Sequence, residues 1–186
     1  MRLSYSSVDT YKTCPLKYKY RHVDHIAEPK SKEAVFGTLI HSVLRFIHAA
    51  PLVPPSVEEA LNLFSQNWNS AIYEDEMEER AAFAQGVQII QRYYQNNDIA
   101  AARVVDLESR FSLEIGDEER GVHTLAGIID RIDKTENGYE IIDYKTARKM
   151  PSQDKVDRDL QLSIYLLAFL NRLPPPRKPR IWKTLR

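Results

Sequence analysis

Residues 125–146 have the sequence LAGIIDRIDKTENGYEIIDYKT, and this stretch decides the fold of the chain. Two runs rich in β-branched and aromatic residues, Leu125–Asp133 and Tyr139–Tyr144, flank Glu136-Asn137-Gly138. Asn-Gly between two such runs is the strongest short signal for a β-hairpin. The stretch therefore predicts two antiparallel strands joined by a tight turn.

The predicted hairpin brings three charged residues to one face. With Asn137-Gly138 as a two-residue loop, counting outward pairs Ile132 with Asp143 and Asp130 with Lys145. Side chains at alternate positions of a strand share a face, so Asp130, Asp143 and Lys145 project from the same side. Unpaired buried charge is costly, which makes these three residues poor candidates for the core.

Two carboxylates beside a lysine suit the hydrolysis of a phosphodiester with Mg²⁺. Carboxylate oxygens are ligands that Mg²⁺ prefers, and the ion lowers the pKa of a bound water. The lysine ammonium can orient that water or offset charge on the phosphorus. The alternative is a surface hairpin in which Lys145 makes a cross-strand ion pair with Asp130, a contact worth little by itself. The spacing, the turn and the flanking isoleucines favour a functional site.

Helical patterns surround three predicted strands. The third strand, Val104–Ile115, precedes the hairpin and is separated from it by GDEERG. Residues 36–50 and the later helices have apolar residues at helical spacing. The order predicts an α+β or mixed α/β fold with a small central sheet flanked by helices. The expected helices run from Ser6 to Cys14, from Phe36 to Ala50, from Ser56 past Trp68, from Glu74 to Asn96 and from Asp157 to Leu170.

The composition is that of one soluble folded domain. The 186 residues are 43% hydrophobic and 28% charged. No apolar run is long enough to cross a bilayer, and MRLSYSS lacks the features of a secretory signal, so we expect a cytoplasmic protein without a membrane partner. The single cysteine, Cys14, excludes an intramolecular disulfide and a cysteine-rich zinc site, and we expect it to be a small buried residue.

The net charge is zero, but the charge is unevenly distributed. Residues 1–32 contain seven Lys or Arg and three Asp or Glu, whereas residues 171–186 contain six Lys or Arg and no acid. Basic ends can attract a phosphate backbone. The alternating run Lys17, Tyr18, Lys19, Tyr20 and Arg21 could bind single-stranded nucleic acid, or form an amphipathic strand with cations reaching the solvent.

The sequence resembles the RecB-type branch of the PD-(D/E)xK nucleases, which stand alone or form the C-terminal part of helicase and helicase–nuclease chains. Five family elements occur in order over nearly the whole chain, which is far more specific than any single motif. They are LSYSSVDTYKTCPLKYKYR (3–21), FGTLIH (36–41) with G-x-x-x-H, AGIIDRID (126–133) with G-x-x-D, IIDYKT (141–146) with D-x-K, and DLQLSIY (159–165) with Q-x-x-x-Y.

The resemblance implies a restriction-endonuclease-like core and a role for each motif residue. It implies that the metal, Mg²⁺ or Mn²⁺, is bound by His41, Asp130, Asp143 and the backbone carbonyl of Tyr144. It also implies that Lys145 is the catalytic lysine. Gln161 and Tyr165, four residues apart on one helix face, would support the site or contact DNA, as would Lys17, Lys19 and Arg21, while Glu108 would be a further acidic contributor. Taken alone, His41 would be a structural histidine, and the other histidines, His22, His25, His48 and His123, are assigned no role.

The chain departs from the family pattern in two places. Family members with an iron–sulfur cluster use a cysteine like Cys14 with three more near the C-terminus, and this chain has no other cysteine, which argues against a cluster. The family also continues with more sheet and helix after the Q-x-x-x-Y helix. We therefore expect a nuclease domain at residues 1–170 that is a fragment, a truncated product or a reduced version, followed by a basic proline-rich tail at residues 171–186.

The function implied is a metal-dependent DNA nuclease with exonuclease or flap-type action on single-stranded ends in repair or recombination. Its partners would be DNA with a free end and a helicase subunit or domain. The alternative is a catalytically inactive DNA-binding or docking module of a helicase–nuclease assembly. The complete set of Asp130, Asp143 and Lys145 favours the enzyme, whereas the short C-terminal region favours the module.

Overall fold

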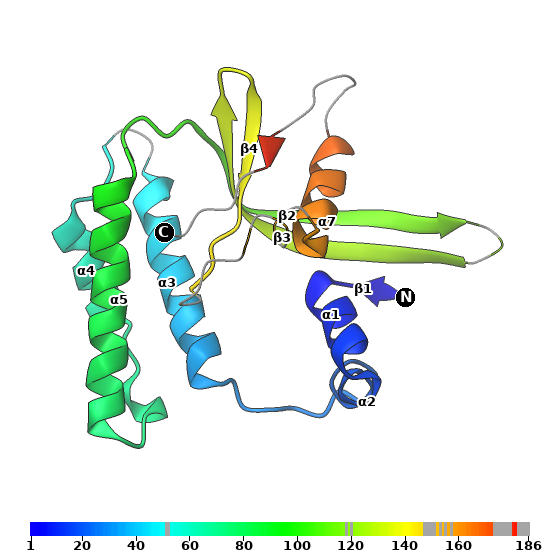
Figure 1. Cartoon of the computed structure of the whole chain (residues 1–186), viewed down its shortest axis with the longest axis horizontal. Helices are drawn as coiled ribbons and strands as arrows, with labels where there is room; N and C mark the ends of the chain where they lie inside the picture. Colours follow the sequence, from blue (N-terminus) through cyan, green and yellow to red (C-terminus); the bar gives the residue numbers. More distant parts are fainter. Residues whose placement is uncertain are drawn as a thin grey trace.

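A computed structural model describes residues 1–50, 53–117, 119, 121–146, 152, 154, 156, 158–172 and 180–181. Helices and a small mixed sheet form the α+β architecture that the sequence predicts (Figure 1). The helices are α1 (Tyr5–Thr13), α2 (Pro15–Tyr18), η1 (Lys19–Val23), α3 (Lys32–Ala49), α4 (Val57–Gln66), η2 (Ser70–Ile72), α5 (Glu76–Asn96) and α7 (Leu160–Leu170), and the strands are β1 (Arg2–Leu3), β2 (Val104–Asp117), β3 (Gly121–Thr135), β4 (Gly138–Ile142) and β5 (Arg180–Ile181).

The sheet is built on the long antiparallel hairpin of β2 and β3. The other edge of β3 is shared, because β1 pairs parallel with it at residues 124–125 and β4 pairs antiparallel with it at residues 131–135. Strand β5, from the region predicted as a tail, pairs parallel with β4. The central meander of β2, β3 and β4 confirms the three predicted strands.

Two hydrophobic cores lie against this sheet. The helical core combines α3, α4 and α5 with Ile142, the last residue of β4, and Tyr144 just after it. The sheet core combines α7 with β2, β3 and Ile141 of β4. Neighbouring residues of β4 thus enter different cores, as expected for a strand buried on both faces. Figure 1 shows α3, α4 and α5 on one side of the molecule and α7 and α1 on the other.

The register of the hairpin differs from the prediction by two residues. Thr135 pairs with Gly138, and Ile132 pairs with Ile141, so Glu136 and Asn137 form the turn. Gly138 has the positive φ, 146°, and is the first residue of β4. The predicted pairs of Ile132 with Asp143 and Asp130 with Lys145 are therefore wrong. A shift of two residues leaves the alternation of side chains along each strand unchanged.

The N-terminal helices differ in detail from the prediction. Helix α1 begins after Ser4, not Ser6, because Ser4 and Ser7 form the capping box. Cys14 is half-buried, and its Sγ accepts a hydrogen bond from the backbone N–H of Lys17 at 3.5 Å, capping α2. The predicted buried position of Cys14 is thus wrong. Lys17–Arg21 is helical, in α2 and the π-helical turn η1, so the alternative of an amphipathic strand is also wrong.

The later helices begin close to the predicted residues. Helix α4 starts after Ser56 as predicted, but it ends at Gln66, so the predicted extension past Trp68 is wrong. Helix α5 begins at Glu76, after Asp75, rather than at the predicted Glu74. Helix α3 begins at Lys32 and is longer than its apolar stripe, because Ser31 caps it. Helix α7 begins at Leu160 after Asp159, and the predicted start at residue 157 lies outside the described residues.

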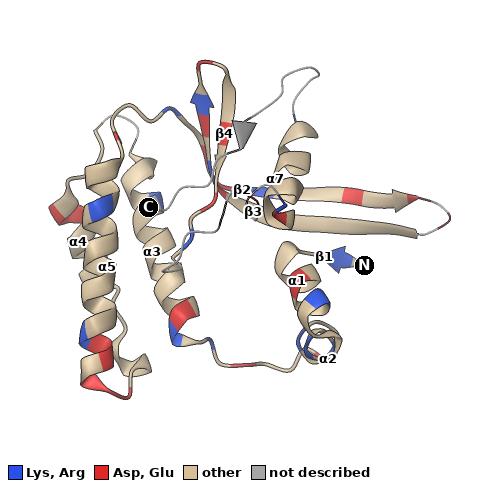
Figure 2. Ribbon diagram, in the orientation of Figure 1, with Lys and Arg blue, Asp and Glu red and all other residues tan. Residues whose placement is uncertain are grey.

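Charges are grouped by region, as Figure 2 shows. Lys and Arg occur on β1 and α2, and α1 carries both signs of charge. Asp and Glu gather at the start of α5, where Glu76, Glu78 and Glu79 lie in its first turn. A negative charge at a helix N-terminus is favourable with respect to the helix dipole. No helix in the described part of the chain is long and apolar enough to cross a membrane.

Candidate active site

The corrected register brings Asp130 and Asp143 toward each other. The ladder of β3 and β4 ends at the pair Arg131 and Ile142, and the next residue on each side is Asp130 and Asp143. The chain stays tied to β3 beyond the ladder, because Asp130 Oδ2 accepts a hydrogen bond from the backbone N–H of Tyr144 at 2.8 Å. The two carboxylates therefore belong to facing positions where the strands separate.

The region around Asp130 is irregular. Ile129 and Ile132 both enter the sheet core although an odd number of positions separates them, so the alternation along β3 changes phase at this point. On β2 the residue across from Asp130 is Glu108, which has a positive φ of 48°. Such irregularities occur next to active sites, where they redirect a side chain.

His41 reaches this irregular region from α3. Its Nδ1 lies 3.4 Å from Asp130 Oδ1, and its ring packs edge-on against Tyr144 at 5.9 Å. Burial lowers the pKa of His41, but the hydrogen bond to Asp130 and the charges of Asp130 and Asp143 outweigh it, so the pKa is raised overall. Gly37, the glycine of the G-x-x-x-H motif, lies one helical turn before His41. A Cβ added at Gly37 would be 3.6 Å from Thr146 Oγ1.

Asp143, Lys145 and Gln161 form a closed group. Lys145 Nζ lies 2.6 Å from Asp143 Oδ2 and donates to Gln161 Oε1 at 2.7 Å. Gln161 Nε2 donates to Asp143 Oδ1 at 2.9 Å and to the Tyr165 hydroxyl at 2.8 Å. Asp143 is only 2% exposed, whereas the Lys145 side chain is 41% exposed. The lysine ammonium is thus fixed by α7 while it remains open to solvent.

The pKa values of two tyrosines respond to the charge of Asp143. Burial raises the pKa of Tyr165, the hydrogen bond with Gln161 opposes this, and nearby Asp143 and Asp130 raise it further, so its hydroxyl stays protonated. Burial also raises the pKa of Tyr5, with smaller contributions from Asp9, Asp159 and Asp143. The start of α1 therefore lies within electrostatic range of the Asp143 carboxylate.

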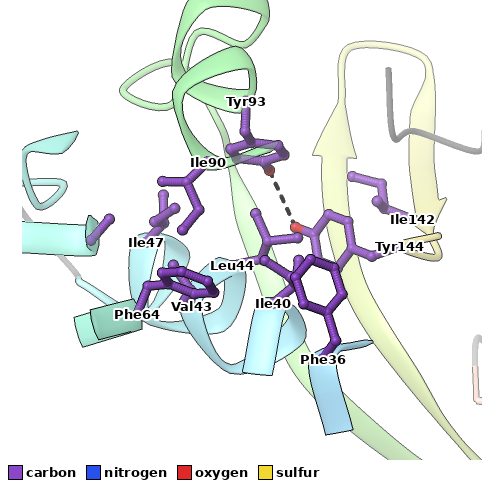
Figure 3. Close-up of a cluster of buried hydrophobic side chains, with 11 residues drawn as sticks. Phe36, Ile40, Val43, Leu44, Ile47, Phe64, Ile90, Tyr93, Ile142 and Tyr144 are labelled. Atoms are coloured by element: carbon purple, nitrogen blue, oxygen red, sulfur yellow. Dashed lines mark hydrogen bonds between the residues drawn. The ribbon is translucent and has the colours of Figure 1, made fainter. Parts of the chain in front are cut away.

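A buried polar network that the sequence analysis missed supports the site from behind. Arg131 donates to Asp133 with Nε at 2.7 Å and Nη2 at 2.5 Å, and its Nη1 donates to the hydroxyls of Tyr93 at 2.9 Å and Tyr144 at 3.2 Å. His48 Nε2 contacts Arg131 Nη1 and lies 2.6 Å from the Tyr93 hydroxyl. Figure 3 shows the 3.3 Å contact between the Tyr93 and Tyr144 hydroxyls inside the helical core.

The network lies directly beside the proposed site residues in the sequence. Arg131 follows Asp130, and Tyr144 stands between Asp143 and Lys145. Arg131 and Asp133 are 8% and 6% exposed. The sequence could have predicted this pair, because two opposite charges among the isoleucines of a buried strand are stable there only when they pair with each other. His48, to which the sequence assigned no role, contacts Arg131 and Tyr93 in this network. This role could not be predicted without knowing how α3 packs beside α5.

Of the remaining predicted residues, Glu108 lies across from Asp130, whereas the basic residues belong to the N-terminal helices. Glu108 forms an ion pair with Arg45 of α3 at 3.0 Å. Lys17, Lys19 and Arg21 are exposed on α2 and η1, and Lys19 is paired with Asp24 at 2.5 Å. They belong to the N-terminal helices, whereas Lys145 and Gln161 contact Asp143 directly.

The donor types fit a hard divalent cation. The candidate ligands are the carboxylates of Asp130 and Asp143 and the imidazole of His41, which lies beside Asp130. Such oxygen-rich sets bind Mg²⁺ or Mn²⁺. Among the described residues, however, no three His, Cys, Asp or Glu side chains stand close enough to hold an ion as they are. The Lys145 ammonium is bonded to the Asp143 carboxylate, so that carboxylate would have to exchange this contact for the cation.

Comparison with known families gives the superfamily of this chain. A model of the PD-(D/E)XK nuclease superfamily matches residues 2–184, which is almost the whole chain. No curated protein sequence matches it significantly. The match extends over β3, β4 and α7, the elements that bring Asp130, Asp143, Lys145 and Gln161 together. The chain therefore belongs to the PD-(D/E)XK nuclease superfamily.

Proposed function

We propose that this chain is a metal-dependent DNA nuclease of the RecB type, acting as an exonuclease or flap-type nuclease on single-stranded ends. The observation that supports it best is the closed group of Asp143, Lys145 and Gln161 beside the pair of Asp130 and His41. Membership of the superfamily gives the general class, a nuclease. The action on free ends, the role in repair or recombination, and the helicase partner follow from the resemblance to RecB-type domains.

In this proposal each residue has a defined task. Asp130, Asp143, His41 and the Tyr144 carbonyl would hold Mg²⁺ or Mn²⁺, which supplies Lewis-acid activation and lowers the pKa of water. Lys145, held by Gln161, would place its positive charge beside the phosphate under attack and stabilise the added negative charge. Gln161 would keep Asp143 and Lys145 at fixed positions, and Tyr165 would orient the Gln161 amide. Helix α7 fixes Asp143 and Lys145 through Gln161, and binding of the cation would require Asp143 to exchange its contact with Lys145.

The test is cleavage of end-labelled single-stranded and duplex DNA by the purified chain with Mg²⁺ or Mn²⁺. We expect Asp143→Ala and Lys145→Ala to abolish cleavage, while Lys134→Ala, an exposed lysine of the same hairpin, leaves it unchanged. Gln161→Ala should lower kcat by roughly 10- to 100-fold, the usual effect of losing a supporting hydrogen bond.

Two outcomes would contradict the proposal. One is cleavage that persists in Asp143→Ala and Lys145→Ala, which would indicate a contaminating nuclease or another site. The other is a folded wild-type protein that cleaves neither DNA with either metal while still binding DNA. That result would favour a catalytically inactive DNA-binding or docking module.

A further inference from the structure

A second feature of the surface is a pocket of about 690 Å³ under the N-terminal helices. It is lined by residues of β1, the start of α1, α2 and the η1 region on one side and by β2 and β3 on the other. None of the proposed metal ligands lines it. Its volume is in the range of pockets that bind small organic ligands or single nucleotides.

The polar residues of the pocket favour an anion. Arg2, Arg110, His22 and His25 line it, and no Asp or Glu is among its described lining residues. Figure 2 shows Lys and Arg on β1 and α2, and both signs of charge on α1. His22 Nε2 is buried and has no hydrogen-bond partner within the described residues, so a polar ligand could satisfy it. The lining thus combines positive charge with an unused hydrogen-bonding nitrogen.

The pocket also has an apolar wall. Tyr18 and Phe111 line it, and the Tyr18 ring lies 5.1 Å from the His22 ring at an interplanar angle of 35°. The Phe111 ring packs directly on Gly127, where an added Cβ would stand 2.6 Å from the ring. Aromatic walls next to cationic groups are typical of sites in which a base stacks while its phosphate is neutralised.

The position of the pocket relates it to Asp130. On the edge of β3 shared by β1 and β4, pairing with β1 ends at Leu125 and pairing with β4 begins at Arg131. The described strands leave residues 126–130 without a neighbour on this edge. Residues 126–128 of this segment line the pocket, and Asp130 is the last residue of the segment. Ile128 and Asp130 are two positions apart along the strand, which corresponds to about 7 Å.

We propose that this pocket binds the nucleotide next to the scissile phosphate of a single-stranded DNA substrate. Arg2 and Arg110 contact its phosphates, and its base lies against Tyr18. A single strand is favoured because its bases are free to leave the stack and meet an aromatic side chain, whereas duplex bases are not. This inference rests on the proposed function, and it assigns DNA contacts to residues other than Lys17, Lys19 and Arg21.

The first test is binding of fluorescein-labelled oligothymidylate, followed by fluorescence anisotropy in EDTA so that cleavage plays no part. The double variant Arg2→Gln/Arg110→Gln should raise Kd roughly tenfold at 0.1 M salt. It should also reduce the slope of log Kd against log salt by about 1.4, since each phosphate contact on a single strand contributes about 0.7. Arg92→Gln, an exposed arginine on α5, is the matched control and should change neither value.

A second test locates the base. Oligothymidylate containing 5-iodouracil is irradiated with the full chain, and the cross-linked peptide is identified by mass spectrometry. We expect an adduct on Tyr18 that disappears in Tyr18→Leu, with circular dichroism showing that the variant is folded. Adducts found only on other residues would overturn the placement of the base.

The outcomes separate this inference from the proposed function. If the wild-type protein binds and cleaves DNA but the double arginine variant has the wild-type Kd and salt slope, the pocket is not a nucleotide site while the nuclease remains. If the wild-type protein does not bind the oligonucleotide at all, both proposals fail. A raised Kd in the double variant with an unchanged control supports the pocket whether or not cleavage is observed.

Discussion

At the scale of single residues, His48 shows how the buried network determines a protonation state. Burial lowers the pKa of His48 to about 4, the neighbouring Arg131 charge lowers it as well, and Asp133 opposes both. The neutral ring is required because the guanidinium of Arg131 already occupies the position facing Nε2. The ordinary pKa of histidine is 6.5, so the folded and unfolded states bind different numbers of protons over a defined pH range.

This difference predicts a pH dependence of stability. Between pH 6.5 and pH 4 the unfolded state binds more protons at His48 than the folded state, so the free energy of unfolding falls as the pH falls. The full loss below pH 4 is on the order of 3 kcal/mol. Urea denaturation at pH 7, 5 and 4 should show a smaller loss in His48→Gln, which keeps hydrogen-bonding capacity but does not titrate. Parallel curves for wild type and variant would show that His48 is not the responsible group.

At the scale of the secondary-structure elements, two glycines in helices have opposite surroundings. A Cβ at Gly86 of α5 would lie 2.2 Å from the ring of Phe64 of α4, and this ring is completely buried. A Cβ at Gly37 of α3 would make only an ordinary contact with Thr146 at 3.6 Å. The close packing of α4 on α5 therefore depends on Gly86, whereas α3 has room for a methyl group at Gly37.

The two glycines therefore predict opposite effects of alanine. Gly86→Ala should lower the free energy of unfolding by up to about 2 kcal/mol, because overpacking costs about 1–3 kcal/mol and the better helix propensity of alanine recovers about 1 kcal/mol. Gly37→Ala should leave the stability unchanged or raise it by up to about 1 kcal/mol. Both values are measured by urea denaturation. A stabilised Gly86→Ala would mean that Phe64 can move without cost.

At the scale of the whole molecule, Arg131 connects the helical layer to the sheet. It belongs to β3, its ion-pair partner Asp133 to the same strand, and its other partners to α3, α5 and the segment after β4. The hydrogen bond with Asp133 and the nearby phenols raise the pKa of Arg131 despite the opposing effect of burial, so its charge is permanent. A buried ion pair of this kind is costly to break by removing one partner.

Paired substitutions test this connection. Arg131→Met should lower the free energy of unfolding by about 3–5 kcal/mol, because it leaves the Asp133 carboxylate buried without its partner. Arg131→Met combined with Asp133→Val removes both charges and should recover a large part of this loss, as measured by urea denaturation. If the double variant is no more stable than the single one, the ion pair is not the source of the effect.

The sequence by itself determined the local features of this protein. The period of the apolar residues predicted the three central strands and most of the helices, because periodicity reflects which face each segment buries. The order of the motifs predicted the superfamily, which the family comparison confirms. Side-chain alternation predicted Asp130, Asp143 and Lys145 on one face, but the alternation along β3 changes phase between Ile129 and Ile132, beside Asp130.

The tertiary structure decided which residues meet across long separations. The prediction placed Gly138 inside a two-residue loop. In the structure Gly138 has a positive φ as the first residue of β4, and the turn consists of Glu136 and Asn137. The contact of His41 with Asp130, the grouping of Arg131 with His48 and Tyr93, and the pocket under the N-terminal helices join segments tens of residues apart. Such contacts follow from the packing of whole elements, and no local pattern in the sequence encodes them.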